Sequence, residues 1–182
     1  MVDTLSKYPQ EIIDKAKKVK LLLLDVDGVL SDGRMIYGSY GDDIKNYNVN
    51  DGLGIMMVRR VGIKCAILTA KASKMVMRRA RDLKIDKVFK DYHYKSEAWD
   101  KIQKFFKVDP QEICYIGDDV LDIPILRRVG FSVCPLNAID EAKEHAQLIT
   151  EKNGGHGAVR EICDLILKAQ DKWDEATKRY YE

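Results

Sequence analysis

The sequence predicts a doubly wound α/β fold, in which a Rossmann-like parallel sheet carries helices on both faces. Short apolar runs alternate with longer amphipathic stretches, and this alternation is typical of repeated strand–helix units. The runs are apolar throughout rather than at every second residue, which indicates strands that are buried on both faces. With 182 residues, the chain is long enough to bury a sizeable core. We expect residues 1–182 to form a single domain.

The expected strands and helices follow one another in a regular order. Each strand is a short apolar run, and each helix repeats apolar residues at intervals of three and four. Ser73 and the Asp109-Pro110 pair are typical of helix or turn starts. The expected strands are residues 20–26, 64–69, 87–89, 113–116, 131–134 and 148–150, and the expected helices are residues 53–61, 73–83, 96–106, 121–129 and 138–145.

One segment interrupts this order directly after the first expected strand. Residues 34–37 and 43–49 flank a Gly-rich stretch at 38–42, and this pattern predicts a β-hairpin. A plain α/β fold would enter a helix at this point, so we expect residues 34–49 to form a flap. The polar C-terminal stretch, residues 168–182, is expected to form a frayed helix or an arm that packs on a neighbour.

Composition and charge exclude several classes of function. The 31 Lys and Arg residues nearly balance the 29 Asp and Glu residues, and the resulting net charge of +2 argues against nucleic acid as a partner. No apolar run approaches the roughly 20 residues that span a bilayer, and the N-terminal residues lack a signal-peptide pattern. The four cysteines form no CxxC pair and are expected to be buried, reduced thiols. We therefore expect a cytoplasmic protein that binds neither nucleic acid nor membrane.

Polar residues stand at the points where several expected strands end. In an open α/β sheet, ligands bind beyond the carboxyl ends of the strands, and these ends lie along one edge. The residues are Asp25 and Asp27 after the first strand, Thr69 at the end of the second, Lys95 past the third and Asp118 after the fourth. We expect them to lie close together.

This set of residues suits phosphoryl transfer with a bound cation. Unpaired buried carboxylates are costly, and the oxygen ligands that Asp25, Asp27 and Asp118 supply favour Mg²⁺. Asp25 is the candidate nucleophile that forms an aspartyl-phosphate, and Asp27 is the candidate acid and base. Thr69 is expected to donate a hydrogen bond to the phosphoryl group. Lys95 and Mg²⁺ would offset the charge on the phosphoryl oxygens.

Three other interpretations account for these residues less well. The DxDG string also begins an EF-hand loop, but the fifth and twelfth positions of that loop would be Val29 and Ile36, which are not calcium ligands. A DxD site for a metal-bound sugar nucleotide explains neither Thr69 nor the GDDVLD string. A receiver domain would place its phosphorylated Asp after the third strand, and the residues that follow 87–89 do not supply that pattern.

The segments DVDGV, Thr69, Lys95 and GDDVLD, taken in this order, resemble the motifs of the haloacid dehalogenase superfamily. Within it, the chain is similar to the 3-deoxy-D-manno-octulosonate 8-phosphate phosphatases over residues 19–170, through LLLLDVDGVLSDG, IKNYNVNDGLGI, YIGDDVLDIPILRRVGFSV and NGGHGAVREICDLIL. The resemblance implies a Mg²⁺-dependent phosphatase without a cap domain that acts in lipopolysaccharide precursor synthesis. It also implies a homotetramer that is assembled through the hairpin flap.

The resemblance further implies roles for single residues. Asp25 becomes the nucleophile and Asp27 the acid and base. Mg²⁺ would be held by the side chains of Asp25 and Asp118 and by the backbone carbonyl of Asp27. Thr69 and Lys95 keep the phosphoryl roles given above. Substrate contacts are implied for Asn48, Asn50, Asp51, Gly52, Lys71, Arg79 and His156.

The chain departs from the family pattern near the expected substrate. Relatives usually have Gly-Arg where this chain has Ala70-Lys71, and basic residues are common at the positions of Asn50, Met56 and His156. An Arg binds a carboxylate through two parallel hydrogen bonds, whereas a Lys acts as a point charge. Two alternatives stay open: the same chemistry on a nonulosonate 9-phosphate or another small phosphate ester, and a catalytically weak domain kept for oligomerisation or binding.

Overall fold

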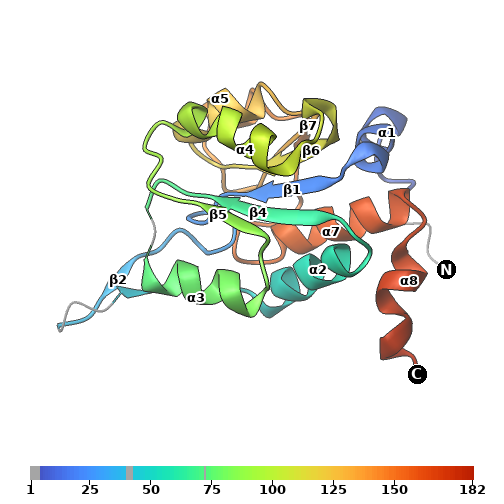
Figure 1. Ribbon diagram of the computed structural model, residues 1–182, viewed down its shortest axis with the longest axis horizontal. Coiled ribbons are helices and arrows are strands. Elements are labelled where there is room, and N and C mark those ends of the chain that lie inside the picture. The colour runs from blue at the N-terminus through green and yellow to red at the C-terminus, as the bar shows by residue number, and fades with distance from the viewer. Residues whose placement is uncertain (1–4, 40–42, 72) are drawn as a thin grey trace.

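A six-stranded parallel sheet forms the centre of the protein, of which the computed structural model describes residues 5–39, 43–71 and 73–182 (Figure 1). The strand order is β5-β4-β1-β6-β7-β8, so the order reverses beside β1. The strands are β1 (Leu21–Leu24), β4 (Lys64–Leu68), β5 (Lys87–Phe89), β6 (Ile113–Ile116), β7 (Phe131–Cys134) and β8 (Leu148–Ile149). Each lies within one of the expected strand ranges, and the predicted doubly wound fold is confirmed.

The central strand is buried because its side chains enter two separate hydrophobic cores. Leu22 and Leu24 belong to one core, and Leu21 and Leu23 belong to the other. All four are fully buried, since successive side chains of a strand point to opposite faces of a sheet that is covered on both sides. This explains why the sequence shows four leucines in a row instead of an alternating pattern.

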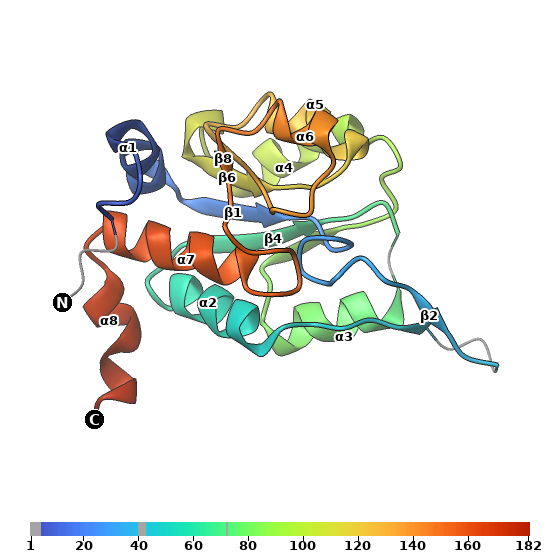
Figure 2. The same ribbon diagram turned by 180° about the vertical axis from the view of Figure 1, so that it is seen from behind.

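Helices cover both faces of the sheet (Figures 1 and 2). The first core lies under α1 (Gln10–Lys18), α2 (Val49–Arg60), α3 (Lys74–Asp82) and α7 (Ala158–Ala169), and the second lies under α4 (Trp99–Phe106), α5 (Ile123–Leu126) and α6 (Asp140–Lys143). The expected helices at 121–129 and 138–145 are shorter than predicted. The first is divided into a 3₁₀ turn at Val120–Asp122 and the single turn of α5.

The predicted hairpin is present and extends past the carboxyl edge of the sheet (Figures 1 and 2). Its strands β2 (Ile36–Tyr37) and β3 (Asp43–Ile44) pair in antiparallel register. A single bridge between Ser31 and Tyr47 continues the pairing towards the sheet. Residues 40–42 of the expected turn lie outside the described residues. Within the described part of the chain, the sheet carries no cap domain beyond this hairpin.

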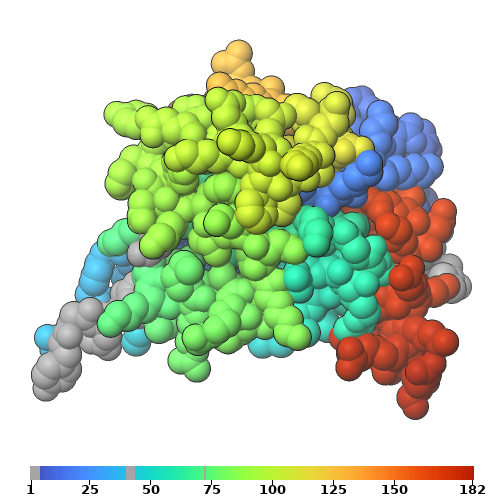
Figure 3. Space-filling model, viewed as in Figure 1, coloured from blue at the N-terminus to red at the C-terminus, as the bar shows by residue number. Residues whose placement is uncertain are grey.

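The C-terminal segment lies at the end of the molecule opposite the hairpin (Figure 3, red). It forms α8 (Trp173–Thr177) and a 3₁₀ turn at Lys178–Tyr180. Arg60 of α2 donates to the carbonyl oxygen of Ala176 and, over 3.0 Å, to the hydroxyl of Tyr180. The segment therefore packs on its own chain, away from the carboxyl ends of the strands. Among the described residues, no helix has the length and apolar character that crossing a membrane requires.

Candidate active site

The loop after β1 turns sharply and brings its two aspartates to the edge of the sheet. Asp25 still follows the strand, because its backbone N–H donates to the carbonyl of Ile116 over 3.0 Å. Gly28 then adopts a φ of +87°, in which a residue with a side chain is strained. A Cβ at Gly28 would also lie 1.9 Å from Asp118 Oδ2. A glycine is therefore required both for the turn and for the approach of the loop after β6.

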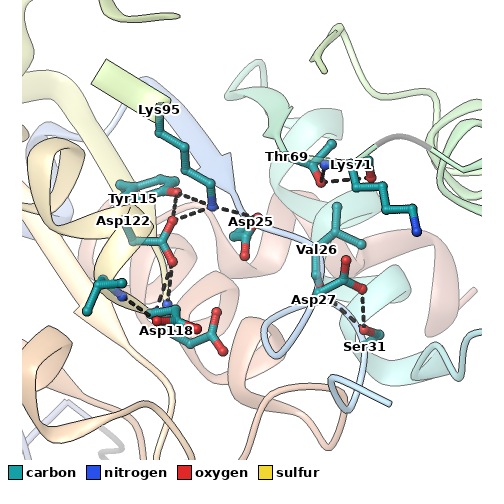
Figure 4. A network of polar contacts seen from close by, with 12 residues as sticks. Asp25, Val26, Asp27, Ser31, Thr69, Lys71, Lys95, Tyr115, Asp118 and Asp122 are labelled. Carbon is teal, nitrogen blue, oxygen red and sulfur yellow. Dashed lines mark hydrogen bonds and ion pairs between the residues drawn. The ribbon is translucent and has the colours of Figure 1, made fainter. Parts of the chain in front are cut away.

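A buried lysine, Lys95, connects Asp25 to Asp122, a further carboxylate in the loop after β6 (Figure 4). Lys95 begins a 3₁₀ turn after β5, and its Nζ lies 2.8 Å from Asp25 Oδ1. The ammonium also contacts Asp122 Oδ1, and it lies 3.3 Å from the hydroxyl of Tyr115. Asp25 and Asp122 raise the pKa of Lys95 against the opposing effect of its burial. The lysine therefore stays protonated beside the carboxylates of Asp25 and Asp122.

Asp122 organises the loop after β6 instead of facing a ligand. Its Oδ2 accepts the backbone N–H groups of Asp118, over 2.8 Å, and Asp119, over 3.1 Å. Its Oδ1 accepts the Tyr115 hydroxyl and the Lys95 ammonium. Both oxygens thus have protein donors, and the side chain is fully buried. We infer that Asp122 fixes the position of Asp118 relative to Lys95.

The cluster carries more negative than positive charge. Oxygens of Asp25, Asp118 and Asp122 lie within 4.8 Å of one another, and Lys95 forms ion pairs with Asp25 and Asp122. Burial raises the pKa of Asp25 to about 7, an effect that Lys95 opposes and the charge of Asp122 reinforces. Burial, together with the charges of Asp25 and Asp122, raises the pKa of Asp118 to about 8. Without a further cation, the cluster favours protonated carboxyl groups.

The donor set fits a divalent cation. Within the described residues, Asp118 Oδ1 is buried and has no hydrogen-bond partner, and leaving a buried acceptor unpaired is costly. Because both oxygens of Asp122 are already engaged, Asp25 and Asp118 are the carboxylates left to bind an ion. Oxygen ligands of this kind suit Mg²⁺, which takes one or two carboxylates and completes its shell with other oxygens.

Asp27 lies on the other side of Asp25 from this cluster. Its Oδ1 contacts the ammonium of Lys45 from the hairpin and lies 3.5 Å from Ser31 Oγ. The Asp27 side chain is 35% exposed, so a substrate can reach it. The proposed contribution of its backbone carbonyl to metal binding stays a prediction.

Thr69 and Lys71 lie beside Asp25, across from Lys95 (Figure 4). Thr69 is buried at the end of β4, and its hydroxyl donates to the carbonyl of Lys71 over 3.1 Å and accepts its N–H over 3.3 Å. The Lys71 side chain is exposed. The structure thus brings Thr69 next to Asp25, the candidate nucleophile, while its hydrogen bond to a phosphoryl group stays a prediction.

The NVNDG segment joins several elements. Asn48 caps α2 by accepting the N–H of Asn50 over 2.7 Å, and its amide donates to the carbonyl of Gly155 over 3.3 Å. Arg79 donates to the Asn48 carbonyl over 2.8 Å. Gly52 leaves room for this arginine, because a Cβ there would lie 2.4 Å from Arg79 Nη2. These contacts are structural, and substrate contacts by the same residues stay predictions.

Asp51 of this segment is fully buried and caps a distant helix. Its carboxylate accepts the backbone N–H groups of Gly157, over 3.3 Å, and Arg160, over 2.8 Å, at the start of α7. A carboxylate in this position satisfies free N–H groups and faces the positive end of the helix dipole. The sequence cannot reveal this role, since residues 51 and 160 are far apart in the chain.

Replacing Asp51 by Ala is expected to lower the free energy of unfolding by about 2 kcal/mol, because the first N–H groups of α7 lose their acceptor. Urea unfolding measures the change. Asn50→Ala, at the exposed neighbouring position, is the matched control and should change stability by less than about 0.5 kcal/mol. An Asp51→Ala variant of normal stability with a strongly raised KM would instead assign Asp51 to the substrate.

His156 stands in a glycine-rich turn that packs on the loop after β1. Its ring Nδ1 lies 3.0 Å from the carbonyl of Gly154. The backbone N–H groups of residues 154, 155, 156 and 157 donate to Asn137, Val29, Asn153 and Asp51 respectively. Because protein acceptors take all four N–H groups, they do not form an anion cradle. A substrate contact by the His156 side chain stays a prediction.

Sequence reasoning places Asp122 near the acidic cluster without a role and does not identify two further side chains of this site, those of Tyr115 and Lys45. Asp122 is part of the GDDVLD string, but nothing in the string shows that both its oxygens face inward. Tyr115 reads as an ordinary apolar strand residue, and Lys45 reads as a polar residue of a hairpin strand. All three are placed by tertiary contacts, and sequence spacing carries no signal of those contacts.

Comparison with known proteins agrees with this geometry. A sequence profile described as haloacid dehalogenase-like hydrolase matches residues 84–162. The 3-deoxy-D-manno-octulosonate 8-phosphate phosphatase of Escherichia coli K12 is 40% identical over 166 residues, which cover 91% of this chain and 88% of that protein.

Two solved structures share the fold over nearly their full length. The phosphatase of the same name from Moraxella catarrhalis, in complex with magnesium ion, phosphate ion and the octulosonate, is 40% identical with a TM-score of 0.91, over 95% of this chain and 99% of that one. The cobalt-bound form of the Haemophilus influenzae phosphatase is 34% identical with a TM-score of 0.86, over 92% and 98% of the two chains.

Proposed function

The chain belongs to the haloacid dehalogenase superfamily. From its similarity to named 3-deoxy-D-manno-octulosonate 8-phosphate phosphatases, we propose that it hydrolyses this ester to the free sugar acid and phosphate. It is a phosphoric monoester hydrolase. The observation that carries the phosphoryl-transfer chemistry is the cluster of Asp25, Asp118 and Lys95. In it, a buried Asp118 oxygen without a partner among the described residues lies beside the loop that bears Asp25. The free sugar acid would enter lipopolysaccharide precursor synthesis.

In the first half of the proposed reaction, a carboxylate oxygen of Asp25 attacks phosphorus. The bond between phosphorus and the sugar oxygen breaks, its electron pair passes to that oxygen, and Asp27 supplies the proton that makes it an alcohol. Lys95 and Thr69 stabilise the charge spread over the phosphoryl oxygens. The products of this step are the free sugar acid and an aspartyl-phosphate on Asp25.

In the second half, a water molecule gives a proton to Asp27 and attacks phosphorus. The bond between Asp25 and phosphorus breaks, inorganic phosphate leaves and both aspartates return to their starting states. The side chains of Asp25 and Asp118 and the backbone carbonyl of Asp27 would hold Mg²⁺. The ion would supply positive charge that offsets the negative charge on the phosphoryl oxygens. Asp122 and Tyr115 keep Lys95 and the loop of Asp118 in place throughout.

The substrate proposal rests on similarity, and one exposed residue keeps an alternative open. Lys71 stands beside Thr69 where relatives usually have an arginine, and a lysine binds a sugar-acid carboxylate as a point charge. Such a contact restricts the position of the substrate carboxylate less than the two parallel hydrogen bonds of an arginine do. A nonulosonate 9-phosphate therefore stays the second candidate substrate.

Assembly and location form part of the same proposal. The hairpin and the start of α2 expose Ile36, Tyr37, Ile44 and Val49, which are between 46% and 81% exposed. Apolar side chains gathered on a projecting flap favour contact with other copies, as the proposed homotetramer requires. All four cysteines are buried and free, which suits the reducing cytoplasm.

Inorganic phosphate release from a panel of esters tests the substrate. We expect Mg²⁺-dependent turnover in which kcat/KM for 3-deoxy-D-manno-octulosonate 8-phosphate exceeds that for a nonulosonate 9-phosphate and for simple sugar phosphates by about tenfold or more. Equal or faster turnover of the nine-carbon acid would replace the first candidate by the second. No turnover of any ester, with the oligomer intact, would favour a domain kept for oligomerisation or binding.

A further inference from the structure

The hairpin brings a buried lysine to the side chain of Asp27. Lys45 directly follows β3, and only 3% of its side chain is exposed, although lysines are rarely buried unless they are paired. Its ammonium donates to Asp27 Oδ1. Lys45 lies in the IKNYNVNDGLGI segment, but the sequence analysis assigns it no role.

The two oxygens of the Asp27 carboxyl group are therefore unequal. Oδ1 accepts the Lys45 ammonium, and the Ser31 hydroxyl lies 3.5 Å from the same oxygen. The Ser31 hydroxyl has one proton and also lies 3.2 Å from the carbonyl oxygen of Val26, so the ammonium is the main donor to Oδ1. An oxygen that accepts a hydrogen bond from a buried ammonium is poorly placed to carry a proton of its own. Oδ2 is thus the oxygen left to hold the proton that Asp27 must transfer.

Burying a lysine to form this pair has a cost. Taking the Lys45 ammonium out of water is expensive, and an ion pair with the partly exposed Asp27 carboxylate is a weak source of net stability. Asp27 also belongs to the loop after β1, whereas Lys45 belongs to the hairpin, so the pair fixes one element against the other. The pair therefore serves to hold the Asp27 carboxyl group in a fixed orientation at the edge of the sheet.

Resting on the function proposed above, we propose that Lys45 is a positioning residue that holds the Asp27 carboxyl group so that Oδ2 delivers its proton to the leaving oxygen. The proton moves as Asp25 bonds to phosphorus and the sugar oxygen takes the electron pair of the breaking bond. Lys45 keeps its own protons and offsets the charge that remains on Asp27. The hairpin is then part of the catalytic geometry as well as a flap.

The test compares two leaving groups in the Lys45→Met variant with Mg²⁺ present. A sugar alkoxide needs a proton in order to leave, whereas p-nitrophenolate leaves without one. We measure kcat/KM, because it reports the steps up to departure of the leaving group and excludes the later hydrolysis of the intermediate. We expect kcat/KM to fall about 10²-fold for the octulosonate 8-phosphate and less than about threefold for p-nitrophenyl phosphate. An equal fall for both substrates would overturn the proposal.

A double variant separates positioning from direct action on the substrate. If Lys45 acts only through Asp27, Asp27→Asn combined with Lys45→Met loses no more activity than Asp27→Asn alone. A further loss in the double variant, multiplied onto the first, would overturn the proposal. Lys45→Arg should recover part of the activity on the sugar phosphate, since it keeps a buried donor for Oδ1. No recovery by Arg together with a multiplied loss would assign Lys45 to the substrate instead.

Asn46→Ala is the matched control. Asn46 is the next hairpin residue, and its amide donates to Asp32 over 3.2 Å, so it contacts the same loop without reaching Asp27. We expect unchanged kcat/KM for both esters. A loss equal to that of Lys45→Met would show that hairpin docking alone is responsible and would overturn the proposal.

Should Lys45→Met fold poorly, Ser31→Ala removes the hydroxyl group near Asp27 Oδ1. We then expect a smaller fall in kcat/KM, confined to the sugar phosphate. A wild-type protein that is silent on both esters would refute the proposed function itself.

Discussion

Replacing Asp25 by Asn is expected to lower kcat/KM for every phosphate ester by on the order of 10⁴-fold or more, because the amide cannot attack phosphorus. The fold should survive. Asn has the same shape as Asp, and its oxygen can still accept a hydrogen bond from Lys95. Phosphate release under Mg²⁺ measures the loss, and circular dichroism with thermal unfolding checks the fold.

A matched charge change elsewhere completes the Asp25 experiment. Asp100 lies on the exposed side of α4, and Asp100→Asn should leave kcat/KM unchanged. The metal-free Asp25→Asn variant should unfold at a temperature no lower than that of the wild type near pH 8, since it removes a charge from a crowded negative cluster. Activity within tenfold of the wild type in Asp25→Asn would refute Asp25 as the nucleophile.

The stability of the protein is expected to depend on pH and Mg²⁺ through the carboxyl groups of Asp25 and Asp118. In the metal-free protein, burial and neighbouring charges raise the pKa of Asp25 to about 7 and that of Asp118 to about 8, from an ordinary value of 3.8. Between about pH 4 and pH 8, the folded protein therefore holds protons that the unfolded chain has released, and its free energy of unfolding falls as the pH rises. Mg²⁺ binds the ionised carboxylates of the folded state and should restore that stability at the upper end of this window.

Asp118→Asn should change both the pH dependence of stability and the stabilisation by Mg²⁺. Without metal near pH 8, the variant is expected to unfold several degrees above the wild type, because it no longer carries the carboxyl group with the unpaired buried oxygen. Its stability should depend less on pH, Mg²⁺ should no longer stabilise it, and turnover should be lost. Thermal unfolding from about pH 5 to pH 8 in EDTA or in Mg²⁺ measures all of this. A variant that Mg²⁺ stabilises as strongly as the wild type would contradict the metal site.

The sheet could be predicted from sequence because its strands bear a strong signal. Runs such as residues 21–24 are apolar at every position, and a sheet that is covered on both faces requires this. Short helices carry less information. α6 buries one residue, Ala142, and gives almost no periodic pattern, so its expected end at residue 145 is too late.

The central part of the site could also be predicted, for a topological reason. Parallel strands end along one edge, so polar residues after β1, β4 and β6 must meet there whatever the details of packing. Strand order alone therefore brings Asp25, Thr69 and Asp118 to one edge, and the structure places them there. It does not determine how each side chain is oriented or which donors it meets.

The remaining contacts depend on elements that sequence spacing cannot orient. Lys45 reaches Asp27 only because the hairpin folds back over the loop after β1. Asp51 follows a helix cap in the chain and would pass for a local capping residue, yet it caps α7, more than 100 residues away. Asx side chains favour helix N-termini in general, and the sequence does not show which helix they serve.

Trapping the covalent intermediate identifies the nucleophile. Borohydride added during turnover reduces an acyl phosphate to an alcohol, which converts the phosphorylated aspartate to homoserine, and peptide mass spectrometry locates the change. We expect homoserine at position 25 only when substrate and Mg²⁺ are present, and none in the Asp25→Asn variant. Continued turnover without modification at position 25, or modification at Asp27 instead, would contradict Asp25 as the nucleophile.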